Sequence, residues 1–143
     1  MHKNFYASGF LYHLATEQIL LQKAPTEEAF PQWSLFGGFN IKKETPEESF
    51  QRIVFQFLQI KISPKDIHPI YSYFHKTMGK NHHLFFAEVK TIKKLSYGKG
   101  LVSWFNKKQI PKLMLEDQVK HDITVGNRVI DAELRKSLGQ QTL

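Results

Sequence analysis

The sequence predicts a mixed α/β fold, and three features of the chain carry that prediction. Runs rich in Phe, Tyr, Ile and Leu, which are favoured in strands, lie on both sides of one clear amphipathic helix. A second predicted helix closes the chain, an order of elements typical of mixed α/β domains. The 143 residues contain no repeat or long linker, so we expect one domain spanning residues 1–143.

The strands are predicted from apolar runs bounded by turn residues. Residues 5–14 and 18–23 form the first pair, and residues 24–32, with two prolines, form a loop. A short strand over residues 33–36 is expected to end at Gly37 and Gly38. Three later strands are expected, the first two as a hairpin: residues 67–76, 82–92 and 101–105.

The clearest helix begins at Thr45, a typical N-cap residue, and Pro46 suits its first position. Glu47 and Glu48 complement the positive end of the helix dipole. Five apolar residues at helical spacing form one stripe: Phe50, Ile53, Val54, Phe57 and Leu58. We expect Ser63-Pro64 to end this helix, helical turns over residues 106–115, and a last helix over residues 117–138, with an interruption at Gly126 left open.

The net charge of +7 is concentrated in residues 61–112, which hold eleven lysines but only Asp66 and Glu88 as acidic residues. Such a stretch can face a nucleotide, a phosphate or RNA. Only three of the 20 basic residues are arginines, the type suited to bidentate recognition of bases and phosphates. A solvated surface is therefore the simpler interpretation, and Glu88 is expected on an exposed strand face.

The absence of cysteine excludes disulfides, thiolate metal sites and a cysteine nucleophile. No apolar run approaches the ~20 residues that a membrane-spanning helix needs. The N-terminal stretch lacks the apolar core and cleavage site of a signal peptide. We therefore expect a soluble cytoplasmic protein without a membrane partner.

Gly38, Glu44 and Arg52 are separated by five and then seven residues, with the run Glu44-Thr45-Pro46-Glu47-Glu48 between them. This spacing and wording resemble the box motif of the Nudix (MutT-like) hydrolase family. The resemblance is specific over residues 33–52, where Trp33 and Leu35 also fit. Residues 103–105, followed by Ile110 and Leu113, are similar to the family's late strand and short helix.

The resemblance implies an α/β/α sandwich with a mixed β-sheet. It also implies a ligand in which a nucleoside diphosphate is linked to another group. On this basis Gly37, Gly38, Glu44 and Arg52 are the expected ligand-binding residues, since glycines permit close backbone approach to a ligand. Glu44 and Glu48 are the catalytic candidates. In the family the arginine usually orients a glutamate, so the role of Arg52 stays open.

The resemblance ends at the metal-binding glutamates, whose positions are held by Ile53, Gln56 and Phe57. Glutamates spaced i, i+3 and i+4 share one helix face, where they bind cations that bridge a diphosphate and activate water. Two apolar side chains and one neutral amide do not supply such ligands. We therefore expect no metal at these positions and lost or impaired hydrolysis. Ile53 and Phe57 then either contact an apolar part of the ligand or fill the former site.

Three alternatives remain open at this stage. Lys43-Glu44-Thr45 is similar to the reduced box of enzymes that act on nucleotide sugars, so an active divergent hydrolase would use Mg²⁺ held by Glu44 with Glu47 or Glu48. That subgroup keeps a glutamate where this chain has Phe57. A second alternative is an RNA- or polyanion-binding module that uses residues 61–112. A third is an interaction partner without a ligand.

Histidines and aromatic residues of the predicted hairpin offer further candidates. His82 and His83 are adjacent in a strand and should face opposite sides, whereas His75 and His82 should approach each other across the hairpin. Tyr71 and Tyr73 are expected mostly in the core, with one or two hairpin aromatics stacking on a base. His121-Asp122 on the last helix is a further candidate pair.

Overall fold

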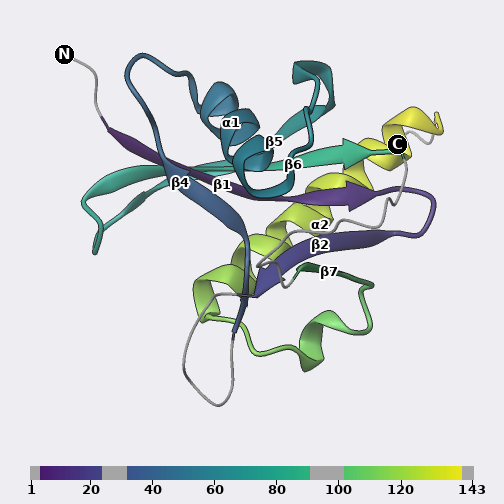
Figure 1. Ribbon diagram of the computed structural model, residues 1–143. Coiled ribbons are helices and arrows are strands. Elements are labelled where there is room, and N and C mark those ends of the chain that lie inside the picture. Colours follow the sequence, from purple (N-terminus) through teal and green to yellow (C-terminus); the bar gives the residue numbers. More distant parts are fainter. Residues whose placement is uncertain (1–3, 24–31, 91–101, 140–143) are drawn as a thin grey trace.

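A computed structural model describes residues 4–23, 32–90 and 102–139 (Figure 1). Its strands and helices, in chain order, are β1 (Phe5–His13), β2 (Gln18–Lys23), β3 (Trp33–Ser34), β4 (Phe36–Phe39), α1 (Pro46–Leu58), the 3₁₀ helix η1 (Pro64–Asp66), β5 (Ile67–His75), β6 (Lys80–Val89), β7 (Val102–Phe105), the 3₁₀ helix η2 (Ile110–Lys112) and α2 (Asp117–Ser137).

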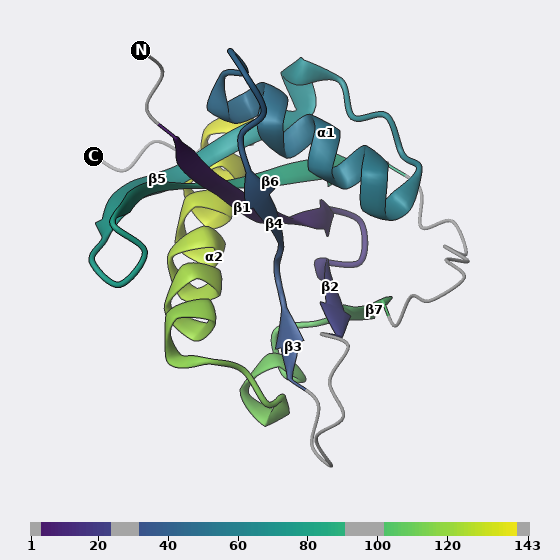
Figure 2. The same ribbon diagram turned by 60° about the vertical axis from the view of Figure 1, so that its left-hand side comes forward.

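The strands of the described residues form one seven-stranded mixed sheet. β1 is central: it pairs with β6 in parallel and with β2 and β4 in antiparallel orientation. β5 and β6 form the expected hairpin, and β2 also pairs with β3 and β7. The two α-helices lie on opposite faces of the sheet (Figure 2), so the α/β/α sandwich with a mixed sheet is confirmed.

Alternation along β1 builds a separate apolar layer under each helix. Ala7 and Leu11 point to one face, where they pack with Phe50 and Val54 of α1. Phe10 and Tyr12 point to the other face, where the core includes Ile123 and Ile130 of α2. Because successive strand residues face opposite sides, the register of β1 decides which residues meet α1 and which meet α2.

Two predicted boundaries around the box segment are wrong. The strand expected to end at Gly37 and Gly38 instead continues through them as β4, because both glycines pair with β1. The helix expected to end at Ser63-Pro64 ends at Leu58. Gln59 adopts the left-handed conformation with φ of 55°, and its N–H donates to the Phe55 carbonyl at 2.8 Å, which closes the last turn.

The last helix runs uninterrupted through Gly126, and its sheet-facing residues include Ile123, Gly126 and Ile130. None of the helices in the described part of the chain is long and apolar enough to cross a membrane. Residues 24–31 of the predicted loop, the predicted strand end at Ile92 and the predicted strand start at Leu101 lie outside the described residues.

The contact between Gly126 and the sheet yields a stability prediction. A Cβ at Gly126 would lie 2.8 Å from Cζ of Phe10 and 3.1 Å from Cδ1 of Ile70, and the Phe10 ring is fully buried. Helix propensity favours alanine over glycine by about 1 kcal/mol, but overpacking of a core costs about 1–3 kcal/mol. We expect Gly126→Ala to lower the free energy of unfolding, measured by urea denaturation.

Ala132→Gly at an exposed position of the same helix is the matched control. It should lower the free energy of unfolding by about 1 kcal/mol through propensity alone. A Gly126→Ala variant more stable than the wild type would show that α2 moves away from Phe10 without loss of packing.

Candidate functional site

The segment that joins β4 to α1 is held by a capping box at the start of the helix. Thr45 Oγ1 accepts from the Glu48 N–H at 3.2 Å, and Glu48 Oε1 accepts from the Thr45 N–H at 2.9 Å. Two otherwise unpaired backbone donors are thereby satisfied. Glu48, a catalytic candidate from the sequence, therefore has a structural role at the helix start, although Glu47 and Glu48 are both exposed.

Glu44 lies just before this cap, and four donors surround its carboxylate. Arg52 Nε donates to Oε2 at 2.7 Å, and Arg52 Nη2 donates to Oε1 at 3.1 Å. The Ile41 N–H and the Ser49 hydroxyl donate to Oε1 at 2.8 and 2.9 Å. Partial burial alone would raise the pKa of Glu44, but these hydrogen bonds and the charge of Arg52 hold it below its usual value.

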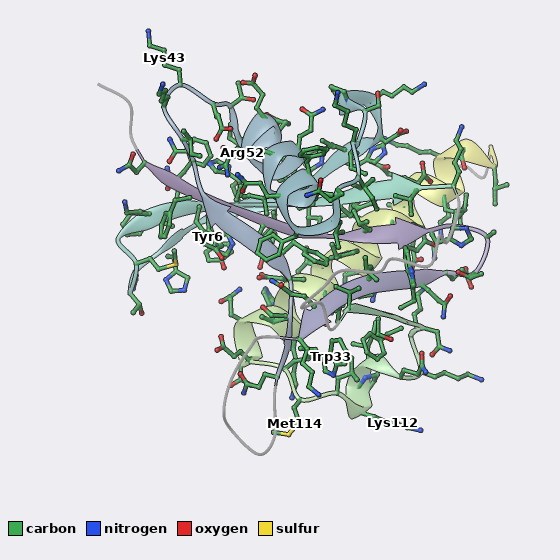
Figure 3. The ribbon with its side chains drawn as sticks, viewed as in Figure 1. Tyr6, Trp33, Lys43, Arg52, Lys112 and Met114 are labelled. Carbon is green, nitrogen blue, oxygen red and sulfur yellow. The ribbon has the colours of Figure 1, made fainter. Side chains whose placement is uncertain are left out.

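Arg52 also binds the backbone of β4 and the next turn of α1. Its Nη2 donates to the Phe39 carbonyl at 2.8 Å, and its Nη1 donates to Gln56 Oε1 at 3.0 Å. All three guanidinium nitrogens are thus engaged by the chain itself. Figure 3 shows Lys43, the neighbour of Glu44, pointing outward from the loop that precedes α1.

The two glycines of β4 project to opposite faces of the sheet. A Cβ at Gly38 would lie 3.2 Å from Cδ1 of Ile53, on the α1 face. A Cβ at Gly37 would lie 2.5 Å from the Tyr6 hydroxyl, on the other face. The space beside each glycine is therefore filled by a side chain of this protein, and the structure does not bring the pair together toward one ligand.

The three positions of the family's glutamates on α1 differ in exposure. Ile53 is only 2% exposed and belongs to the α1 core, whereas Phe57 is 43% exposed and contacts the ring of Phe36 at a centroid distance of 5.8 Å. Of the two alternatives left open by the sequence, Ile53 fills the core, whereas Phe57 is exposed and can contact a ligand. The side chain between them in sequence, Gln56, is the exposed partner of Arg52.

Glu44 and Gln56, the two polar candidates in the box segment, do not fit a magnesium site. Mg²⁺ prefers carboxylate and water oxygens in octahedral geometry, but the Glu44 carboxylate already accepts four hydrogen bonds. The Gln56 carbonyl oxygen accepts from Arg52. Within the described ranges, no group of three or more His, Asp or Glu side chains could hold a metal ion.

On the other face of the sheet, four ring side chains line up across four neighbouring strands. Phe39 of β4 pairs with Tyr6 of β1, Tyr6 with His82 of β6, and His82 with Tyr73 of β5. Ring centroids along this aromatic row are 5.1, 4.8 and 5.0 Å apart. Phe39 connects the row to the box segment, because its carbonyl accepts from Arg52.

Two members of the row, His82 and Tyr73, also belong to a chain of hydrogen bonds that begins at Ser8. Ser8 Oγ lies 2.7 Å from His82 Nε2, and the Tyr73 hydroxyl lies 2.7 Å from His82 Nδ1. Burial, with smaller effects of His75 and His83, lowers the pKa of His82 to about 4, so the ring is neutral at pH 7. A neutral imidazole carries one N–H, and one of its two neighbours therefore donates to it.

The N-terminal half of α2 adds a buried carboxylate beside the row. Asp122 is 1% exposed and accepts from the Tyr71 hydroxyl at 2.5 Å and from Gln118 Nε2 at 2.9 Å. Burial raises the pKa of Asp122 despite these hydrogen bonds. Tyr71 and Tyr73 are only partly buried. The predicted approach of His75 and His82 is confirmed at a centroid distance of 6.3 Å, and His83 faces the opposite side of the sheet, against Phe5.

The aromatic row was not predicted from the sequence. Its members come from segments as far apart as Tyr6 and His82, and only the lateral register of four strands aligns them. Of the lysine-rich stretch, Lys80 borders the row, with Nζ 5.2 Å from the Phe39 ring centroid. Residues 91–101 of that stretch lie outside the described part of the chain.

No family model matches the sequence, and no curated protein is similar to it in sequence. Similarity appears instead among solved structures. The NUDIX domain of Shewanella oneidensis NrtR, solved in complex with ADP ribose, has a TM-score of 0.70 and 12% identity over 91% of this chain and 90% of that one. A mutT/nudix family protein from Listeria innocua has a TM-score of 0.65 and 16% identity over 96% and 98% of the two chains.

The C-terminal domain of mouse MUTYH, solved in complex with human PCNA, has a TM-score of 0.68 and 11% identity, over 99% of this chain and 96% of that one. Several of the similar structures are Nudix or MutT proteins. The chain therefore has the Nudix fold. At these identities the likeness establishes the fold alone.

The Glu44–Arg52 pair yields a prediction with a defined pH dependence. We expect Glu44→Gln to lower the free energy of unfolding by about 1–3 kcal/mol at pH 7, because charged hydrogen bonds are lost and Arg52 loses its counter-charge. The pKa of Glu44 is lower in the folded state. Its contribution is therefore present above the unfolded-state pKa and is lost as the pH falls through the folded-state pKa.

Urea denaturation at a series of pH values checks this prediction: the gap between wild type and variant should close toward acid pH. Glu47→Gln, at an exposed carboxylate in the first turn of α1, is the matched control and should change stability by less than about 0.5 kcal/mol. A gap that stays constant with pH would contradict the role assigned to the carboxylate.

Proposed function

We propose that this protein is a member of the Nudix family that binds a nucleoside diphosphate linked to a second group, and that residues 1–143 act as one binding domain. Hydrolysis of the diphosphate with a metal is proposed to be lost or strongly reduced. The observation that carries the proposal is the aromatic row, which is linked to the box segment through Phe39, whose carbonyl accepts from Arg52. The box helix has Ile53, Gln56 and Phe57 at the metal positions. The NrtR domain complexed with ADP ribose supports this class of ligand.

The aromatic row offers the chemistry that a nucleobase needs. Phe39 is 49% exposed, and its neighbour Tyr6 is partly buried. Stacking of a base on an aromatic ring is worth about 1–3 kcal/mol. Tyr71, Tyr73 and Gln118 supply hydroxyl and amide groups beside the rings, which can select among base edges. Lys80 adds positive charge next to Phe39 for an anionic diphosphate.

Loss of hydrolysis is supported by the hydrogen bonds of the carboxylates that could replace the missing metal ligands. Glu44 is saturated by hydrogen bonds, and Glu48 completes the capping box. Glu47 remains exposed in the first turn of α1. An active hydrolase using Mg²⁺ on Glu44 with Glu47 or Glu48 would have to break the pair that holds the β4–α1 segment. RNA binding through residues 61–112 is distinguished from nucleotide binding by its salt dependence in the experiment below.

Binding is tested by calorimetry with ADP-ribose and related nucleoside diphosphate compounds in the presence of EDTA. We expect saturable binding that survives high salt, and Phe39→Leu should weaken it about tenfold through lost stacking. Phe74→Leu is the matched control, because Phe74 is 59% exposed on β5 and alternates to the opposite face from Tyr73. Equal effects of the two variants would contradict base binding at the aromatic row.

Salt dependence separates the RNA alternative, because binding through lysine–phosphate contacts falls steeply with salt. Release of nucleoside monophosphate with Mg²⁺ or Mn²⁺ separates the active-hydrolase alternative. Turnover that Glu44→Gln abolishes would contradict the proposed loss of hydrolysis.

Restoring carboxylates to the box face provides a gain-of-function prediction. We expect Gln56→Glu/Phe57→Glu to acquire saturable Mn²⁺ binding, measured by electron paramagnetic resonance, because both side chains are exposed and stand at the positions of the family's metal-binding glutamates. Gln59→Glu/Phe74→Glu, with the same residue types at exposed positions of two different elements, is the control for added charge. Saturable Mn²⁺ binding by the wild type would contradict the absence of a metal site.

A further inference from the structure

A second candidate site lies on the α2 face of the sheet, away from the aromatic row. It is a cavity of about 160 Å³ between the C-terminal half of α2 and strands β1, β5 and β6. Tyr12 lines it six residues along β1 from Tyr6 of the aromatic row, which is about 20 Å in an extended strand. The cavity is therefore independent of the proposed nucleotide site.

Tyr12 is the first observation that points to a ligand here. Tyr12 is only 4% exposed and lines the cavity, and within the described residues no hydrogen bond of its hydroxyl is found. No buried side-chain oxygen lacks a partner in this part of the chain, so the hydroxyl is the accessible end of Tyr12 and is free to bond to water or to a ligand in the cavity. Burial, with the carboxylates of Glu17, Asp131 and Glu88, raises the pKa of Tyr12, so the hydroxyl stays neutral in a negative environment.

Two carboxylates border the same cavity. Glu88 lies directly beside Tyr12 in the β1–β6 ladder, on the α2 face, where it is half-buried rather than fully exposed as expected. Within the described residues, Glu88 makes no ion pair or hydrogen bond. Glu133 of α2 lies 3.4 Å from His68 Nδ1, a long contact. A chain with a net charge of +7 thus concentrates negative charge at this cavity.

The remaining walls are aromatic and apolar. The His68 ring stacks on Phe86 at a centroid distance of 4.9 Å, and Tyr12 meets Phe86 edge-on at 6.3 Å. Ring faces attract cations, most strongly where water is excluded. Ile130 and Leu134 of α2 close the opposite side.

We propose that this cavity binds a small organic cation, a primary ammonium ion carried on one ring or a short aliphatic chain. The ammonium group lies between Glu88 and Glu133, with the Tyr12 oxygen as a third acceptor, and the apolar part contacts Phe86. The volume suits one ring, since an engineered cavity of about 150 Å³ in another protein holds benzene.

The test is a titration of the full ¹⁵N-labelled chain with benzylammonium chloride, followed by NMR. Benzyl alcohol and phenylacetate, neutral and anionic compounds of similar shape, are the ligand controls. We expect saturable shifts at the amides of Glu88, Ile130 and Glu133, and about tenfold or more weaker binding of benzyl alcohol, as expected for a lost charged hydrogen bond. Glu88→Gln should weaken benzylammonium binding about tenfold, and Tyr12→Phe by a smaller factor.

Glu116→Gln, at an exposed carboxylate just before α2, is the matched control and should leave benzylammonium binding unchanged. ADP-ribose binding by Glu88→Gln should equal that of the wild type, which separates failure of this proposal from failure of the proposed function. The proposal is overturned if benzyl alcohol binds as tightly as benzylammonium. It is also overturned if Glu88→Gln and Glu133→Gln bind benzylammonium like the wild type, or if the shifts do not saturate.

Discussion

The ion pair between Arg52 and Glu44 ties the end of β4, the segment before α1 and the helix itself together. The guanidinium binds the Glu44 carboxylate, the Phe39 carbonyl at the end of β4 and Gln56 one turn further along α1. Its exposed fraction is 23%, so water screens it only in part. Because Phe39 also supplies one end of the aromatic row, the position of that ring depends on a charge pair on the opposite face of the sheet. Arg52 can therefore shape the proposed ligand site without contacting a ligand.

The same bonding pattern explains how α1 keeps its place with Ile53, Gln56 and Phe57 on this face. Ile53 packs against Gly38 in the α1 core, and this apolar contact replaces a face that would otherwise need cations to offset neighbouring carboxylates. The capping box secures the helix start independently of any ligand. With both ends of the segment held by the chain itself, the fold does not need a metal at this position, which supports the proposed separation of binding from hydrolysis.

Local signals explain what the sequence predicts well. Thr45, Pro46 and the apolar stripe of α1 act within one or two helical turns, so the start and the buried face of α1 follow from residue type and spacing. The helix end does not, because the left-handed Gln59 carries no residue-type signal. The aromatic row and the cavity depend on lateral register between distant strands. Alternation along a strand shows which of its side chains share a face of the sheet, but it does not show which residue of the neighbouring strand each one pairs with.

Both proposed sites use α2 as one wall, and the packing of that helix connects them. Asp122 in its N-terminal half binds Tyr71 beside the aromatic row, and Glu133 near its C-terminal end borders the cavity. Between them Gly126 approaches Phe10 so closely that no side chain fits. This contact sets how closely the middle of α2 packs on the sheet, and with it the positions of the polar groups toward both ends of the helix. Groups held in position before a ligand arrives reduce the entropy lost on binding, so substitution at Gly126 bears on both proposed sites.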